Sequence, residues 1–112
     1  MSSISTHVLD VARGRPAAAV PVTLSILEGG SYRELGRGVT DADGRLKTLL
    51  GGAPLAAATY RLVFDTGAYF AALGIDGFYP EASIVFSVRD AGQHHHVPLL
   101  LSPFGYSTYR GS

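Results

Sequence analysis

Hydrophobic and polar residues alternate in short runs along this chain, with the period of two that is typical of β-strands. In residues 20–27 every second position is aliphatic, and the positions between hold Pro21, Thr23 and Ser25. The same alternation predicts further strands at 4–10, 31–40, 45–49, 59–64, 82–88 and 93–101, with a last hairpin that turns at 102–105. Loops or tight turns are expected at 13–16, 41–44 and 51–54.

One segment departs from this pattern. Tyr69, Phe70 and Leu73 recur at helical spacing between Thr66, a candidate cap, and Gly74, which predicts about two helical turns. Seven or eight short strands in 112 residues, with a turn about every ten residues, favour an all-β fold, an antiparallel β-sandwich with one short helix.

Composition limits what such a domain does. We expect residues 1–112 to form a single domain, because 46% hydrophobic and 16% charged residues suit a packed core rather than a disordered polyelectrolyte. The chain has no cysteine, so disulfides, thiolate catalysis and cysteine-type zinc sites are excluded.

Charge and hydropathy argue against two classes of partner. Nine basic and nine acidic side chains balance, so we expect neither nucleic acid nor an anionic membrane as a partner. The longest hydrophobic runs are far shorter than the ~20 residues of a membrane-spanning helix. The first ten residues lack the basic and hydrophobic regions of a secretory signal, and the last three are not Ser-Lys-Leu. We therefore expect a cytoplasmic protein.

Four histidines are the first candidates for chemistry, because histidine titrates near neutral pH. In the strand expected at 93–101, His94 and His96 face one side and His95 faces the other. The side of His95 is otherwise aliphatic, so it predicts core, whereas the side of His96 predicts a cleft or an interface. In the first strand, His7 shares a face with Ser5.

Periodicity leaves the function of these histidines open. A His-x-His pair such as His94 and His96 can ligate a metal, but the sequence identifies no third ligand. Surface histidines also need no function, and an arginine after a turn, such as Arg45, is more often a solvated charge.

Five short motifs favour one function for these histidines over the others. They are residues 4–10 (ISTHVLD), 43–45 (DGR), 78–81 (FYPE), 94–103 (HHHVPLLLSP) and the terminal 109–112 (YRGS). Together they resemble the 5-hydroxyisourate hydrolases, the enzymatic branch of the transthyretin-related family, over nearly the whole chain. One mild departure is His95, where an aromatic residue is common in that family.

The resemblance implies a site. Its catalytic residues would be His7, Arg45, His96 and Ser112, and its substrate-binding residues would be His7, Arg45, Tyr109, Arg110, Gly111 and Ser112. No metal and no cofactor are implied. Transthyretins proper carry different residues at the positions of His7, Arg45 and His96 and lack the Arg-Gly-Ser ending, so a hormone-binding module is the alternative that these residues disfavour.

The resemblance also implies a reaction and an assembly. The reaction is hydrolysis of 5-hydroxyisourate to 2-oxo-4-hydroxy-4-carboxy-5-ureidoimidazoline in urate degradation, a step of purine metabolism. Such chemistry needs a base for water, donors for the oxyanion and an acid for the leaving nitrogen; His7 and His96 would share the proton transfers, Arg45 would bind the anionic ring, and the Ser112 hydroxyl or carboxylate would orient a histidine or the water. The implied assembly is a prealbumin-like homotetramer, a dimer of dimers, with its sites in a channel at the dimer–dimer interface.

Overall fold

The computed structural model describes residues 3–112, which form nine strands and one short helix. The strands are β1 (Ile4–Asp10), β2 (Arg15–Pro16), β3 (Pro21–Glu28), β4 (Ser31–Val39), β5 (Arg45–Leu46), β6 (Ala58–Phe64), β7 (Ala82–Val88), β8 (His95–Ser102) and β9 (Gly105–Thr108), and the helix is α1 (Thr66–Ala72). Two of the predicted strands, 4–10 and 82–88, have the bounds that the sequence predicts.

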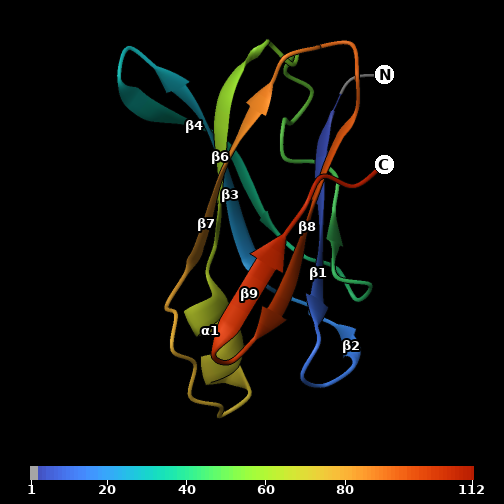
Figure 1. Ribbon diagram of the computed structural model, residues 1–112, viewed down its shortest axis with the longest axis vertical. Coiled ribbons are helices and arrows are strands. Elements are labelled where there is room, and N and C mark those ends of the chain that lie inside the picture. The colour runs from blue at the N-terminus through green and yellow to red at the C-terminus, as the bar shows by residue number, and fades with distance from the viewer. Residues whose placement is uncertain (1–2) are drawn as a thin grey trace.

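Two sheets face each other and confirm the predicted sandwich (Figure 1). One has the order β2-β1-β8-β9, with β5 also paired to β1, and the other has the order β4-β3-β6-β7. All pairs in residues 3–112 are antiparallel except β1 and β8, which run parallel, with Ser5 opposite His96. That parallel pair is the central feature of the sheet that carries the candidate site.

The core lies between the sheets and follows the predicted alternation. On β6, Tyr60, Leu62 and Phe64 are buried, and on β3 the aliphatic positions of the predicted strand are buried as well. On β8, His95 is buried with Val97, Leu99 and Leu101. The face of β8 that carries His96 therefore points out of the sandwich, as the sequence predicts.

The helix α1 begins one residue earlier than the sequence predicts. The cap is Asp65, whose Oδ1 accepts a hydrogen bond of 2.9 Å from the backbone nitrogen of Ala68, whereas the Thr66 hydroxyl donates to the Tyr79 carbonyl. The Tyr69 hydroxyl donates to the buried Asp10 carboxylate at 2.7 Å, which fixes the helix to the end of β1. The residues described include no helix that is long and apolar enough to cross a membrane.

Two other segments differ from the sequence prediction. The strand predicted at 45–49 ends at Leu46, because the chain then leaves the sheet edge and buries Leu49 and Leu50 in the core. The segment predicted as a loop at 13–16 contains β2, which pairs with the end of β1. Both differences arise from tertiary contacts that local periodicity does not encode.

Candidate active site

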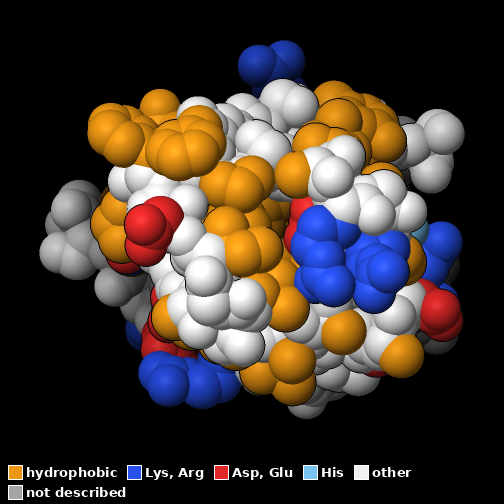
Figure 2. All heavy atoms as spheres, turned by 90° about the horizontal axis from the view of Figure 1, so that it is seen from below, with side chains coloured by type: hydrophobic (Ala, Val, Ile, Leu, Met, Phe, Trp, Pro, Cys, Tyr) orange, Lys and Arg blue, Asp and Glu red, His pale blue; other side chains and the backbone are white. Residues whose placement is uncertain are grey.

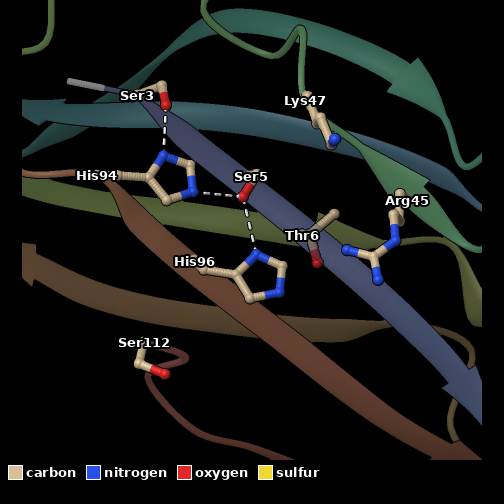
Figure 3. Close-up of a pocket in the computed structure, with 8 residues that line it drawn as sticks. All are labelled: Ser3, Ser5, Thr6, Arg45, Lys47, His94, His96 and Ser112. Atoms are coloured by element: carbon tan, nitrogen blue, oxygen red, sulfur yellow. Dashed lines mark hydrogen bonds between the residues drawn. The ribbon is translucent and has the colours of Figure 1, made fainter. Parts of the chain in front are cut away.

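A cavity of about 350 Å³ lies where β1, β5 and β8 carry polar side chains (Figure 3). Its lining is Ser3, Ser5, Thr6, Arg45, Lys47, His94, His96 and Ser112. The lining contains two imidazoles, two cationic side chains and four hydroxyl groups, and none of its side chains is acidic. Such a cavity suits a small anionic or strongly polar ligand.

The parallel pairing of β1 and β8 joins the two imidazoles to Ser5. The Ser5 hydroxyl oxygen lies 2.8 Å from His96 Nδ1 and 2.9 Å from His94 Nε2. His94 Nδ1 is hydrogen-bonded to the Ser3 hydroxyl at the outer end of the cavity. Because His96 Nδ1 is engaged by Ser5, Nε2 is the ring nitrogen left for a ligand.

The surroundings of His96 favour its neutral form. Burial is the largest cause that lowers the pKa of His96, and coulombic interactions with His94, His7, Arg45 and Lys47 lower it further. At neutral pH the imidazole therefore has a free lone pair, which a general base needs.

Arg45 is positioned by the turn before it. The Asp41 carboxylate accepts 2.9 Å hydrogen bonds from the backbone nitrogens of Arg45 and Asp43, and the first of these is the largest cause that lowers the pKa of Asp41. Gly44 has φ +75°, and a Cβ there would lie 2.4 Å from the Val8 carbonyl oxygen, so only glycine fits against β1.

The two cations of the cavity have no acidic partner. Both ion pairs found within residues 3–112, Arg33 with Glu28 and Arg37 with Glu34, lie elsewhere. The side chains of Arg45 and Lys47 are exposed, so their charges are available to a ligand. A guanidinium also presents a planar fork of donors that matches a carboxylate or an enolate.

His7 lies beside the cavity rather than in its lining. It faces Arg45 across the β1–β5 pair and Pro98 across the β1–β8 pair. Its Nε2 donates a 2.8 Å hydrogen bond to the Asp43 carbonyl oxygen, because a carbonyl can only accept. Neutral His7 therefore carries its free lone pair on Nδ1.

The two halves of the terminal tetrapeptide, residues 109–112, face different cavities. The backbone nitrogen of Gly111 donates to the His96 carbonyl at 2.8 Å, and Ser112 reaches the cavity. Tyr109 and Arg110 instead line a second cavity of about 270 Å³ between β7 and β8, where Arg110 Nη2 donates to Gln93 Oε1. Within the chain, the structure brings Gly111 and Ser112 to His96, and it places Tyr109 and Arg110 on another side.

Sequence reasoning did not assign Ser3, Ser5, Thr6, Lys47 or His94 to the site. For three of them a signal was available. His94 precedes His96 by two positions and shares its predicted face. Ser5 shares the face of His7 on β1, and Lys47 follows Arg45 by two positions, so strand parity places each beside a residue that the motifs identify. The hydrogen bonds that join Ser5 to both imidazoles depend on the β1–β8 register, which the sequence alone does not reveal.

The metal alternative rests on the pair of His94 and His96. Their ring centroids lie 6.3 Å apart, and each ring has a nitrogen bonded to Ser5. Residues 3–112 contain no group of three or more His, Cys, Asp or Glu side chains that could hold a metal ion.

Comparison with known proteins gives a consistent assignment. Residues 4–111 match the family model described as "HIUase/Transthyretin family". The chain is 47% identical to a 5-hydroxyisourate hydrolase of Caulobacter vibrioides, with all of both chains covered. It is 44% identical to a mouse 5-hydroxyisourate hydrolase, with 99% of this chain and 96% of the mouse protein covered.

Solved structures match at the level of the fold. The Klebsiella pneumoniae 5-hydroxyisourate hydrolase superposes with a TM-score of 0.88 at 44% identity and covers all of both chains. A sea bream transthyretin in complex with thyroxine superposes with a TM-score of 0.91 at 33% identity and covers 97% of this chain and 94% of the other. Since the fold resembles both an enzyme and a hormone-binding protein, the residues of the cavity have to distinguish between the two activities.

Proposed function

The chain belongs to the HIUase/Transthyretin family, and we propose that it is a hydrolase that opens the ring of 5-hydroxyisourate in urate degradation. The observation that carries the proposal is the cavity beside β1 and β8. Within the described residues 3–112, its lining includes His96, whose Nε2 is free, and Arg45, which forms no ion pair with an acidic side chain. These are the groups that hydrolysis of an anionic cyclic amide requires.

The reaction proceeds by attack of water on a ring carbonyl. His96 Nε2 takes a proton from the water, and Arg45 donates to the oxygen on which negative charge develops. The tetrahedral intermediate then collapses, the ring carbon–nitrogen bond breaks, and the departing nitrogen receives the proton. Lys47 adds a second positive charge for the substrate anion, and Ser112 orients the water or the imidazole.

His7 and the tetrapeptide complete this site. His7 lies on the same face of β1 as Ser5. Its coulombic interaction with His96 is one of the causes that lower the pKa of His96. We propose that His7 shares the proton transfers and that Gly111 and Ser112 close the substrate pocket of their own chain. Because Tyr109 and Arg110 line the second cavity of their own chain, we propose that they bind substrate through the assembly of copies. No metal or other cofactor takes part in this scheme.

Hormone binding is the competing proposal, because the sea bream transthyretin shares this fold. A cavity lined by hydroxyls, imidazoles and two cations suits a small polar anion better than a large hydrophobic hormone. The composition of the cavity therefore favours hydrolysis.

We further propose a homotetramer, a dimer of dimers with the sites in a channel between the dimers. One edge of the first sheet is β9 and one edge of the second is β7, and a strand at a sheet edge has backbone groups that can pair with another copy. Hydrophobic side chains are spread over the end of the sandwich near α1 and the β8–β9 turn (Figure 2), where Phe78 and Phe104 are 68% and 72% exposed. A second copy would cover them. The cytoplasmic location is likewise a prediction.

The activity is tested by generating 5-hydroxyisourate in place with urate oxidase and following the loss of its ultraviolet absorbance. Catalytic amounts of the protein should accelerate this loss in the presence of a chelator. A rate equal to the spontaneous one would refute the hydrolase, and activity that a chelator abolishes and a metal restores would favour the metal alternative.

A further inference from the structure

A continuous line of four polar side chains runs from the surface to the reacting face of His96 (Figure 3). Ser3 contacts His94 Nδ1, His94 Nε2 lies 2.9 Å from the Ser5 hydroxyl oxygen, and that oxygen lies 2.8 Å from His96 Nδ1. The two imidazole rings are nearly parallel, with an angle of 18° between them. Ser5 is thus the only link between the rings in this line, and it touches both.

The backbone pairing of β1 with β8 fixes the positions of these four side chains. Ser5 is the direct partner of His96 in the parallel β1–β8 pair, and the backbone nitrogen of His95 donates to the Ser3 carbonyl at 2.8 Å. Ser3 and Ser5, before and within β1, therefore alternate along one seam with His94 and His96, before and within β8. Ser5 is 5% exposed, so its hydroxyl meets the two imidazoles rather than bulk water.

Two arrangements let the Ser5 hydroxyl donate one hydrogen bond and accept one between the two imidazoles. A serine hydroxyl has one proton to donate, and a neutral imidazole has one N–H group. In the first arrangement His96 Nδ1 donates to Ser5, and Ser5 donates to His94 Nε2, so His96 Nε2 is unprotonated. In the second arrangement the two hydrogen bonds of Ser5 reverse, and His96 Nε2 carries the proton.

The two arrangements correspond to the two roles that His96 has in the proposed hydrolysis. We propose that Ser5 and His94 form a proton relay that converts His96 from a base at Nε2 into an acid at Nε2 within one turnover. This inference rests on the proposed hydrolysis. Ser5 and His94 act through His96, so they are positioning residues.

The relay conserves protons over the cycle. When His96 Nε2 takes a proton from water, the Nδ1 proton of His96 passes to the Ser5 oxygen, and the Ser5 hydroxyl proton passes to His94 Nε2. The positive charge then lies on His94. When the ring nitrogen of the substrate departs, it takes the proton from His96 Nε2, and the other transfers reverse. The net result moves one proton from water to the leaving nitrogen.

Electrostatics favour this displacement of charge. The charged and titratable groups around His96 are His94, His7, Arg45 and Lys47, and Arg45 and Lys47 are both cationic at neutral pH. A positive charge kept on half-buried His96 would be desolvated, and burial lowers its pKa. His94 is exposed, so water solvates the same charge there.

His94→Gln is the sharpest variant for a test. A glutamine amide can still hydrogen-bond to Ser3 and Ser5, but it cannot accept a proton at neutral pH. We expect kcat to fall by at least about tenfold, a part of the ~10²–10⁴-fold that acid–base groups contribute, while KM changes little. Ser5→Ala should have a similar effect on kcat, because it removes the link.

His95→Gln is the matched control, since the same replacement one residue along faces the core. Ring nitrogen-15 spectra of His96 give a readout that does not require turnover: the balance between the Nδ1–H and Nε2–H tautomers should shift in Ser5→Ala. Added imidazole should restore part of the activity of His94→Ala, because a free base can take the vacated position.

The outcomes separate this inference from the proposed function. If the unaltered protein does not accelerate 5-hydroxyisourate decay, the hydrolase proposal fails. If the unaltered protein is active and His94→Gln and Ser5→Ala match it in kcat and in pH profile, the relay is refuted while the hydrolase stands. An unchanged His96 tautomer balance in Ser5→Ala would also contradict the relay.

Discussion

The two ring nitrogens of His96 have different surroundings, and this asymmetry suits a general base. Nδ1 is bonded to Ser5 at 2.8 Å, while Nε2 is left to the cavity. Strand parity predicts from the sequence that His96 faces away from the core and that His95 faces inward, and both predictions are confirmed. The partner on β1, Ser5, was not predictable, because it depends on the register of two strands and lies 91 residues from His96 in the sequence.

The lowered pKa of His96 predicts the acid side of the pH profile. Burial disfavours the imidazolium form, so kcat/KM should fall on acidification only below about pH 6.5, the ordinary value for histidine. Between the pKa of the folded state and that ordinary value the unfolded chain binds more protons, so folding stability should also decrease as the pH falls. A kinetic pH profile and denaturant unfolding at several pH values measure the two effects. An acid limb centred above pH 6.5 would contradict this account.

Gly111 is expected to be intolerant of a side chain. A Cβ on Gly111 would lie 2.6 Å from Cδ2 of His96 and 3.2 Å from its Cγ, so Gly111→Ala must displace the imidazole or the terminal segment. Misplacing a catalytic group by about 1 Å can cost about a hundredfold, so kcat should decrease strongly with little change in thermal stability. Gly105→Ala is the control, because its nearest neighbour would be 3.8 Å away. Equal activity in the two variants would contradict the placement of Gly111.

The terminal segment after β9 can be tested as a unit. If residues 109–112 close the pocket, a chain that lacks them should fold and associate but lose most hydrolytic activity. A merely structural tail would instead lose a little stability and leave turnover intact. Circular dichroism, light scattering and the absorbance assay on the truncated chain distinguish the two, and full activity would show that the site rests on His7, Arg45 and His96 alone.

Most strands were predictable because their periodicity is strong and their ends carry turn residues. Ile4–Asp10 and Ala82–Val88 agree with the prediction, and the hairpin at 102–105 joins β8 to β9 as expected. The strand at Arg45 is shorter than predicted because Leu49 and Leu50 turn into the core. The parallel pairing of β1 with β8 could not be read from local patterns, since a strand's own alternation does not specify its neighbour.

In the whole molecule, β9 forms one edge of the first sheet and β7 forms one edge of the second sheet. We expect a homotetramer in solution, because pairing of these edges and coverage of Phe78 and Phe104 would remove exposed hydrophobic surface. Light scattering at micromolar protein measures the mass, and the midpoint of thermal unfolding should rise with protein concentration. A monomer that is fully active would contradict the interfacial channel.

The central claim is that this cavity hydrolyses 5-hydroxyisourate through His7, Arg45 and His96. It is tested most directly by one comparison of absorbance decay, with a chelator present, among the unaltered protein, His7→Ala, Arg45→Ala, His96→Ala and His95→Phe at equal concentration. The unaltered protein and His95→Phe should be similarly active, and the three alanine variants should each lose ~10²–10⁴-fold in turnover while keeping the fold. No acceleration by the unaltered protein, or equal loss in His95→Phe and His96→Ala, would contradict the account.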